Sequence, residues 1–285
     1  MSFRVEPGEL FGLLGPNGGG KSTLFRILST LLPASGGRAR ILGHDVATEP
    51  HAVRRALGVV FQHPSVDGLL TVEENLVHHG HLYGLSGIPL RRALGEVLAR
   101  LGLADRRRER VARLSGGLKR RTELAKALLV GARVMLLDEP STGLDPAARR
   151  DLVAWLLERR EDGIAIVLTT HDMDEAERCD RIAILDRGCV VALGAPATLT
   201  AEVGGDVVVV HAAAVEALRE RVRARFGIEG RVVDGALRLE RPRGHELVRD
   251  LIEAFPEAVR SVTYGKPTLE DVLVRRTGHR LGDDA

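Results

Sequence analysis

Apolar and polar residues follow one another along the chain in patterns that predict an α/β fold. Short, continuous apolar runs are typical of parallel strands covered on both faces, and residues 134–137 and 164–168 are such runs. From Leu90 to Leu101, apolar residues recur every three or four positions, which predicts a helix with one buried face. We expect strands at 10–14, 56–61, 134–137 and 164–168, and helices at 21–31, 90–101, 115–129 and 146–160.

The pattern changes at Gly204-Gly205-Asp206, so we expect two domains, 1–203 and 204–285. Apart from a last helix, the second domain has the predicted order β-α-β-β-α-β, which is typical of a small ferredoxin-like α+β domain. It contains no catalytic constellation, and we expect a regulatory or dimer-stabilising role. Its predicted elements are a strand at 207–211, a helix at 213–226, a hairpin through Asp234-Gly235, a helix at 244–255, a strand at 259–264 and a helix at 268–276.

The composition favours a soluble globular protein. The 285 residues are 44% hydrophobic and 28% charged, with a net charge of +2. The basic run from Arg100 to Arg121 is either a solvated face or a nucleic-acid footprint. Aromatic residues make up only 3%, too few for a stacking platform, so we expect no nucleic-acid partner. No apolar run approaches the roughly 20 residues of a membrane helix, and residues 1–7 lack a signal core, so we expect a cytoplasmic chain.

The strongest chemical signal is Gly15-x-x-x-x-Gly20-Lys21-Ser22 between a predicted strand and a predicted helix. Glycines let the backbone curl so that its N–H groups point at phosphate oxygens, and the helix N-terminus adds its dipole. Lys21 is expected to reach the β- and γ-phosphates of a nucleoside triphosphate, and the Ser22 hydroxyl to ligate Mg²⁺. The predicted nucleotide-binding residues here are Gly15, Pro16, Asn17, Gly18, Gly19, Gly20, Lys21, Ser22 and Thr23.

Two acids follow the apolar run 134–137. The carboxyl end of a parallel strand faces the ligand crevice of an α/β domain, so Asp138 and Glu139 are expected there. Asp138 is suited to hold Mg²⁺ through water, and Glu139 is suited to orient or deprotonate an attacking water. A pair of acids at a strand end can also be merely solvated, and it is the phosphate loop that favours the catalytic interpretation.

Two further motifs carry a resemblance. Leu114-Ser115-Gly116-Gly117 precedes a predicted helix, and Ser141-Thr142-Gly143-Leu144-Asp145 follows the two acids. In order and spacing they resemble the signature loop and D-loop of the ATP-binding cassette (ABC) ATPases. Gln62 matches the glutamine of that family's Q-loop, and His171 matches its switch histidine. The resemblance covers roughly residues 3–200.

The resemblance implies a head-to-tail dimer, with a homodimer as the expected form. The phosphate loop of one copy and the Ser115, Gly116 and Gly117 loop of the other would enclose each ATP, with Asp145 near the same nucleotide. It implies Glu139 as catalytic base and His171 at the γ-phosphate, with Lys21 and Gln62 as the other catalytic residues. Mg²⁺ would be held by Ser22, Gln62 and Asp138. The implied cofactors are ATP and Mg²⁺, with no further stable metal site.

Several stretches resemble the daunorubicin-resistance type of bacterial exporter ATPase. They are Phe61–Asp67, Leu82–Leu85, Lys119–Arg121 and Pro267–Val272. The resemblance implies an exporter subunit that couples dimer closure to transport by a separate integral membrane permease. The chain would then lie at the inner face of the cell membrane through that permease, with a drug, lipid or similar cargo.

One departure concerns residues 1–9. Members of the family carry a preceding segment with an adenine-stacking aromatic and the first strand of an antiparallel β-subdomain, and neither is found here, where Phe3 is the only ring. We therefore expect an N-terminally shortened β-subdomain, from a misassigned start codon or in a truncated, ATPase-impaired copy. The alternative function is a non-transport ABC ATPase that acts on the ribosome or on nucleic acid.

Overall fold

The computed structural model describes residues 1–63 and 65–279. Its larger part is built on a six-stranded sheet with the order β4-β5-β6-β1-β7-β8. The first five of these strands pair in parallel, and β8 pairs antiparallel with β7. The strands are β1 (Leu10–Leu14), β4 (Leu57–Val60), β5 (Val134–Asp138), β6 (Ala165–Thr170), β7 (Arg181–Asp186) and β8 (Cys189–Gly194).

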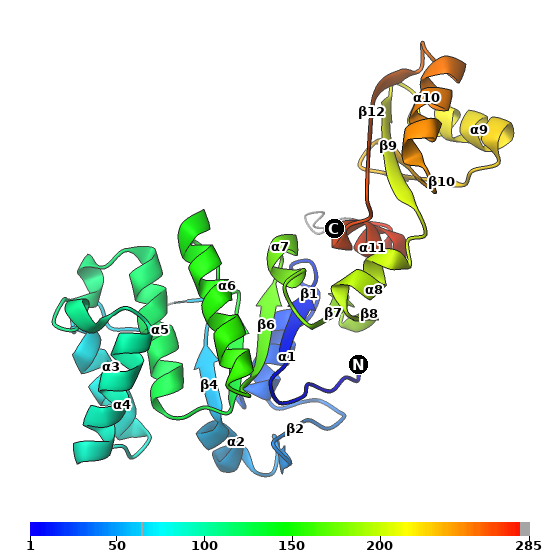
Figure 1. The fold of residues 1–285 in the computed structure, drawn as a ribbon. Coiled ribbons are helices and arrows are strands. Elements are labelled where there is room, and N and C mark those ends of the chain that lie inside the picture. Colours follow the sequence, from blue (N-terminus) through cyan, green and yellow to red (C-terminus); the bar gives the residue numbers. More distant parts are fainter. Residues whose placement is uncertain (64, 280–285) are drawn as a thin grey trace.

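Helices cover both faces of this sheet (Figure 1). A separate pair of two-residue strands, β2 (Arg40–Ile41) and β3 (His44–Asp45), forms a small hairpin, and 3-10 turns lie at Ala104–Arg106 and Val111–Arg113. The helices of this part are α1 (Lys21–Leu28), α2 (Pro50–Ala56), α3 (Val72–Leu82), α4 (Gly87–Arg100), α5 (Gly116–Leu129), α6 (Pro146–Glu161), α7 (Met173–Ala176) and α8 (Pro196–Ala201).

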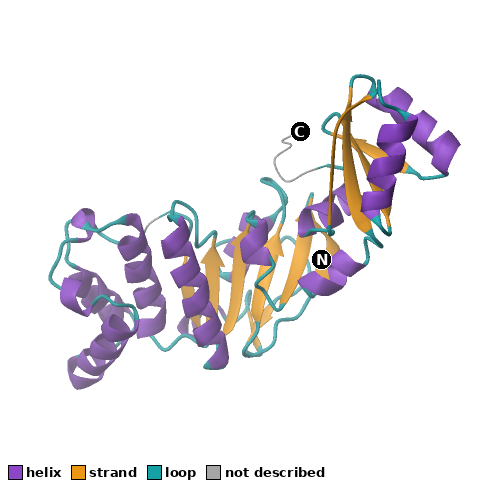
Figure 2. Cartoon of the chain, turned by 45° about the horizontal axis from the view of Figure 1, so that its top comes forward, coloured by secondary structure: helices purple, strands orange, loops and turns teal. Residues whose placement is uncertain are grey.

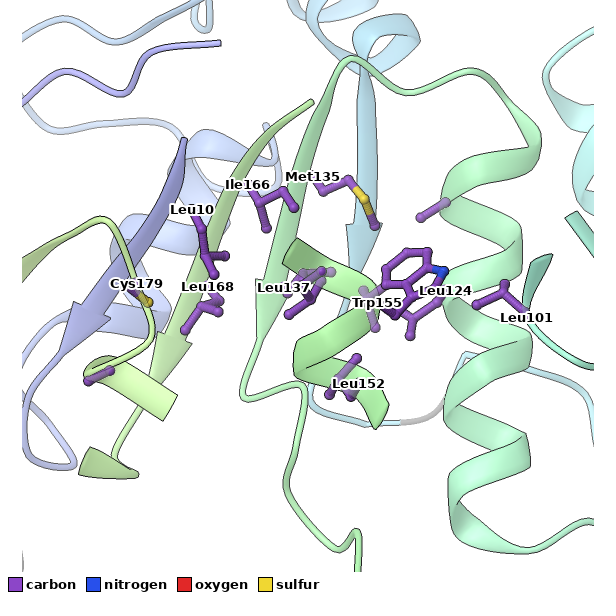
Figure 3. Close-up of a cluster of buried hydrophobic side chains, with 14 of the residues drawn as sticks. Leu10, Leu101, Leu124, Met135, Leu137, Leu152, Trp155, Ile166, Leu168 and Cys179 are labelled. Carbon is purple, nitrogen blue, oxygen red and sulfur yellow. The ribbon is translucent and has the colours of Figure 1, made fainter. Parts of the chain in front are cut away.

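The core has two layers because successive strand residues point to opposite faces. In β1, Leu10 and Leu14 join one apolar cluster, and Phe11 and Leu13 join the other. This burial on both faces explains the continuous apolar runs of the sequence. Figure 3 shows part of the first cluster, in which strand residues meet α6 and α5 side chains: Leu10, Met135, Leu137, Ile166, Leu168, Leu152, Trp155 and Leu124.

The helices α3, α4 and α5 form a helical region at one end of the sheet, at the left of Figure 1. The α3 helix begins at a capping box, in which the Thr71 hydroxyl accepts from the Glu74 N–H and the Glu74 carboxylate accepts from the Thr71 N–H. At the other end of α3, Leu82 is 83% exposed, and Ile88 on the next helix is 74% exposed. This region thus leaves large apolar side chains facing solvent.

A second sheet lies in the C-terminal part of the chain, with the order β10-β11-β9-β12 and antiparallel pairing throughout (Figure 2). The helices α9 and α10 share an apolar core with it. At the β10–β11 turn, Asp234 and Gly235 have φ values of 51° and 70°, as the predicted two-residue hairpin requires. The elements are β9 (Asp206–Ala212), α9 (Val215–Phe226), β10 (Gly230–Val233), β11 (Ala236–Arg241), α10 (Gly244–Ala254) and β12 (Val259–Gly265).

The last helix, α11 (Leu269–Thr277), packs on the first part of the chain. Leu269 and Leu273 belong to the larger core together with Leu199 of α8. The carboxylate of Asp271 lies 3.2 Å from Arg238 of β11, and both side chains are 10% exposed. The four-stranded sheet is therefore connected to α8 both along the chain and through the contacts of α11.

The sequence predicted most of these elements, and the differences have local causes. The predicted helix 21–31 ends at Leu28, because Thr30 adopts φ 63° and cannot continue it. The predicted strand 56–61 is shorter, since Ala56 closes α2. The strands β2, β3, β7 and β8 and the helices α2, α3, α7 and α8 were not predicted. None of the helices within the described ranges is both long and apolar enough to cross a membrane.

Candidate functional site

The loop between β1 and α1 encloses the ammonium group of Lys21. Lys21 is 5% exposed, and its Nζ donates to the carbonyl oxygens of Gly15 at 2.6 Å and Pro16 at 2.9 Å. Burial lowers the pKa of Lys21, while the charges of Glu139 and Asp138 act in the opposite direction. An ammonium group has three N–H donors, so these two carbonyls leave one for an anion.

Glycine is required in this loop for two different reasons. A Cβ atom on Gly15 would lie 2.2 Å from the carbonyl oxygen of Leu185, so no larger residue fits there. Gly18 and Gly20 have φ values of 75° and 99°, which residues with side chains rarely adopt. A turn of this kind directs backbone N–H groups toward a common point ahead of the helix, where an anion can bind.

The other predicted residues of this loop lie on the same turn. Ser22 and Thr23 are exposed on the first turn of α1, and Asn17 is exposed in the loop, whereas Pro16 and Gly19 are buried. The N-cap residue of α1 is Gly20, so no N-cap side chain accepts a hydrogen bond from the first N–H groups of the helix. The first N–H groups of the helix therefore stay available to a ligand.

Asp138 ends β5 beside the end of β6. The parallel register places Asp138 opposite Thr169, and Thr169 Oγ1 donates to Asp138 Oδ1 at 2.5 Å. Asp138 is 9% exposed. One carboxylate oxygen is thus held by the threonine, at the sheet edge where parallel strands present their ligand-binding groups.

Three segments of the chain, which follow β4, β5 and β6, meet at Glu139. Its φ is 45°, and its N–H donates to Thr169 Oγ1 at 2.9 Å, which holds the residue in this uncommon conformation. Gln62 Nε2 and Thr142 Oγ1 donate to Glu139 Oε2 at 3.1 and 3.2 Å. His171 Nδ1 lies 3.3 Å from Glu139 Oε1. The predicted residues Gln62, Glu139 and His171 are therefore brought together by the fold.

A small cavity of about 120 Å³ adjoins this cluster. Glu139, Thr142 and His171 contribute to its wall. The side chain of Glu139 is 12% exposed and that of His171 is 56% exposed. A carboxylate that is oriented by neighbouring side chains and open to a water-sized space can accept a proton from a bound water.

Ser115 and Asp145 lie at the starts of two other helices, α5 and α6. Ser115 is exposed at the N-cap of α5, where its Oγ accepts from the N–H of Leu118, and Gly116 and Gly117 follow in the first turn. Asp145 caps α6. Its carboxylate accepts hydrogen bonds from N–H groups of α6, and these hydrogen bonds lower the pKa of Asp145. Among the described residues, no hydrogen bond joins Ser115 or Asp145 to the loop 15–20. In one chain, both residues act as helix caps.

Two residues at this site were missed by sequence reasoning. Thr169 orients both Asp138 and the N–H of Glu139, and the strand register is the signal that would have placed it. Arg120 on α5 donates to the carbonyl oxygens of Asp138 and Glu139. Arg120 stands in a run of three basic residues, and this pattern alone cannot distinguish a buried guanidinium from a solvated one.

Comparison with known proteins identifies the family of this chain. The sequence profile of the family described as ABC transporter matches residues 1–142. The daunorubicin/doxorubicin resistance ATP-binding protein of Streptomyces peucetius is 38% identical over 99% of this chain and 88% of its own length. The Nod factor export ATP-binding protein I of Paraburkholderia xenovorans is 37% identical over 99% of this chain and 92% of its own length.

Solved structures agree with this grouping. CbiO1 from Clostridium perfringens, part of an ABC transporter complex, matches 80% of this chain and 88% of its own with a TM-score of 0.66 and 27% identity. A dimeric ATP-binding cassette in a post-hydrolysis state with ADP and Pi matches 68% of this chain and 88% of its own, with a TM-score of 0.61 and 29% identity. The chain therefore belongs to the ABC transporter family and is an ATPase of the ABC type.

Proposed function

We propose that this chain is the ATP-binding and ATP-hydrolysing subunit of a bacterial exporter. The names of its relatives, which describe drug resistance and Nod factor export, support the direction of transport. Because an ABC exporter needs a membrane pathway, we propose a separate integral membrane subunit as partner. The chain would then work at the cytoplasmic face of the membrane. The exposed apolar residues at the ends of α3 and α4 and the segment after Gln62 are the proposed contact region.

ATP is the proposed substrate, bound with its phosphates over Lys21. The buried ammonium group and the glycine-rich turn of residues 15–20 are suited to the β- and γ-phosphates. Mg²⁺ fits the oxygen donors of Ser22, Asp138 and the Gln62 amide, because Mg²⁺ prefers a few protein oxygens completed by phosphates and water. Among the described residues, no group of three or more His, Cys, Asp or Glu side chains is placed to hold a metal ion.

The proposed reaction is an in-line displacement at the γ-phosphorus. A water oxygen forms a bond to this phosphorus while the bond to the β–γ bridging oxygen breaks, which yields ADP and phosphate. Glu139 accepts the proton of the water, and Gln62 and His171 hold the two oxygens of its carboxylate. The convergence of these two side chains on Glu139 is the observation that carries the proposal.

We propose that two copies complete each site. The Ser115–Gly117 loop is an exposed helix N-terminus with no acidic residue in the first turn of α5, and such a terminus is suited to the γ-phosphate on the facing copy. Asp145 would lie at the same interface. A second copy of this chain is the proposed partner, in head-to-tail arrangement.

The residues 204–285 are proposed as an accessory domain that follows the ATPase domain 1–203. The strand order β10-β11-β9-β12 with two helices supports a ferredoxin-like arrangement. We propose a regulatory or dimer-stabilising role, to which the packing of α11 on α8 lends support because it links the two parts. Deletion of residues 205–285 tests this role: unchanged dimerisation and coupling would contradict it.

The variant Glu139→Gln tests the proposed function. Glutamine keeps the shape of the side chain but cannot accept the proton, so we expect ATP binding without turnover and a closed dimer that sedimentation detects. Exposed Glu177→Gln is the matched control, with unchanged phosphate release. Undiminished ATPase activity of Glu139→Gln would refute the assignment of Glu139 as the catalytic base.

Affinity purification of the Glu139→Gln protein with ATP from detergent-solubilised membranes identifies the partner. A stoichiometric polytopic membrane protein supports the exporter, whereas co-purified ribosomes or nucleic acid would exclude it. Recovery of the chain without bound ATP would contradict the proposed nucleotide site.

A further inference from the structure

The guanidinium group of Arg120 lies buried between α5 and the site. Arg120 is 8% exposed, and each of its five N–H groups has an acceptor. Nε donates to the Pro140 carbonyl at 2.8 Å, one terminal nitrogen to the Asp138 and Glu139 carbonyls at 3.2 and 3.3 Å, and the other to the Phe61 carbonyl and to Glu123 Oε2 at 2.8 Å each.

Glu123 completes this arrangement from the next turn of α5. Its side chain is 3% exposed, with one oxygen on Arg120 and the other accepting the N–H of Ser65 at 2.5 Å. The adjacent face of α5 adds Lys126, whose Nζ donates to the Ser65 carbonyl at 2.8 Å. The same helix thus holds the backbone on both sides of Gln62, at Phe61 and at Ser65.

These contacts determine the distance between Gln62 and Glu139. Gln62 Nε2 meets the Glu139 carboxylate at 3.1 Å, and the main chain of each residue is anchored to Arg120 or next to it. A single rigid fork therefore spans the two segments whose side chains meet at the proposed base. A lysine at this position presents its donors from one point and cannot reproduce the planar fork whose separate nitrogens meet carbonyls on both segments.

We infer that Arg120 and Glu123 are positioning residues for ATP hydrolysis, which act through Gln62 and Glu139. They join the helix that begins at the Ser115–Gly117 loop to the end of β5 and to the Gln62 segment. A shift of this helix therefore moves the side chains of both Gln62 and Glu139. This inference rests on the proposed ATPase function.

A purely structural ion pair is the competing explanation, and the contact pattern argues against it. A buried ion pair stabilises a fold weakly, and apolar residues of similar volume often serve as well. Four of the five Arg120 donors bind main-chain carbonyls, three of them at consecutive residues from Asp138 to Pro140. The guanidinium therefore supports the shape of the β5 end, where Glu139 adopts a φ of 45°.

The test compares Arg120→Lys and Glu123→Gln in the full chain, with phosphate release for kcat and KM and titration for the ATP Kd. We expect kcat to fall about 10- to 100-fold, because small displacements of catalytic groups cost this much, with Kd and KM changed less than about threefold. Arg92→Lys, at the exposed pair with Glu96 on α4, is the control and keeps the activity of the unmodified chain.

A double-mutant cycle with Gln62→Ala separates positioning from folding. If Arg120 acts through Gln62, then Arg120→Lys lowers kcat less in the Gln62→Ala background than alone. Unchanged kcat in Arg120→Lys, or losses that multiply fully in the double variant, would overturn the inference while the ATPase function stands. Absence of hydrolysis by the unmodified chain would instead overturn the proposed function, and with it this inference.

Discussion

The side-chain amide of Gln62 donates to the carboxylate of Glu139 at 3.1 Å, although the two residues are 77 positions apart in the chain. His171 approaches the other oxygen of the same carboxylate at 3.3 Å. The carboxylate is thereby oriented from two sides. If Glu139 is the base as proposed, this arrangement affects the rate of hydrolysis.

Replacing Gln62 with alanine is expected to lower kcat about 10- to 100-fold. A hydrogen bond to a charged group contributes about 1.5–3 kcal/mol, and its loss leaves Glu139 free to turn away from the water. The affinity for Mg-ATP is expected to fall by a smaller factor than kcat, because one proposed Mg²⁺ ligand is lost while Lys21, Ser22 and Asp138 remain. Phosphate release and nucleotide titration measure the two effects. His63→Ala, at the exposed neighbour, serves as the control, and an equal loss there would contradict the role of Gln62.

Lys21→Met is expected to weaken ATP binding about 10- to 100-fold, the effect of removing a charged hydrogen-bond donor from the phosphates. The carbonyl oxygens of Gly15 and Pro16 also lose their donor, so the loop becomes less well ordered. Isothermal titration with Mg-ATP measures the affinity. Lys266→Met, which breaks an ion pair with Asp206 far along the sequence, is expected to bind ATP normally. If Lys21→Met binds Mg-ATP as tightly as the unmodified chain, Lys21 does not contact the phosphates.

Gly15→Ala tests the close approach of the loop to β7. The added Cβ atom would lie 2.2 Å from the Leu185 carbonyl, so the backbone must move, at an expected cost of about 1–3 kcal/mol in the free energy of unfolding. ATP binding should weaken at the same time because the N–H groups shift. Gly36→Ala, where the new methyl group meets nothing within 4 Å, is the matched control. Urea unfolding compares them, and equal midpoints would show that the loop relaxes without cost.

The stability of the fold is expected to fall in mild acid because of His79. Burial, and secondarily the charge of Lys126, lowers the pKa of His79 to about 4. Between pH 6.5 and 4 the unfolded chain therefore binds more protons than the folded chain, so stability decreases as pH falls through this window, by about 1–2 kcal/mol after allowance for solvent screening. His79→Gln should reduce the loss of stability between pH 7 and pH 5, whereas exposed His78→Gln should not reduce it. Thermal unfolding at pH 7 and pH 5 measures this, and parallel curves for His79→Gln and the unmodified chain would exclude the effect.

The elements with a strong local pattern were predicted from the sequence. The apolar run 134–137 became β5, the phosphate loop stands between β1 and α1 as expected, and the hairpin at Asp234-Gly235 has the predicted turn. The match to ABC transporters and to exporter ATP-binding proteins confirms the family that the motifs indicated. Such features were predictable because turn geometry and strand burial depend on neighbouring residues.

The amino-acid sequence alone determined which chemistry the chain can carry: a glycine loop with Lys21, two acids at a strand end, and an α/β order of elements. Only the tertiary structure decided which groups meet. Arg120, within the basic run 119–121, points inward to five acceptors, and α11 packs against the core of the first part of the chain. The physical reason is that such contacts join residues far apart in the chain. They depend on how sheets and helices pack, which no periodicity within one segment encodes.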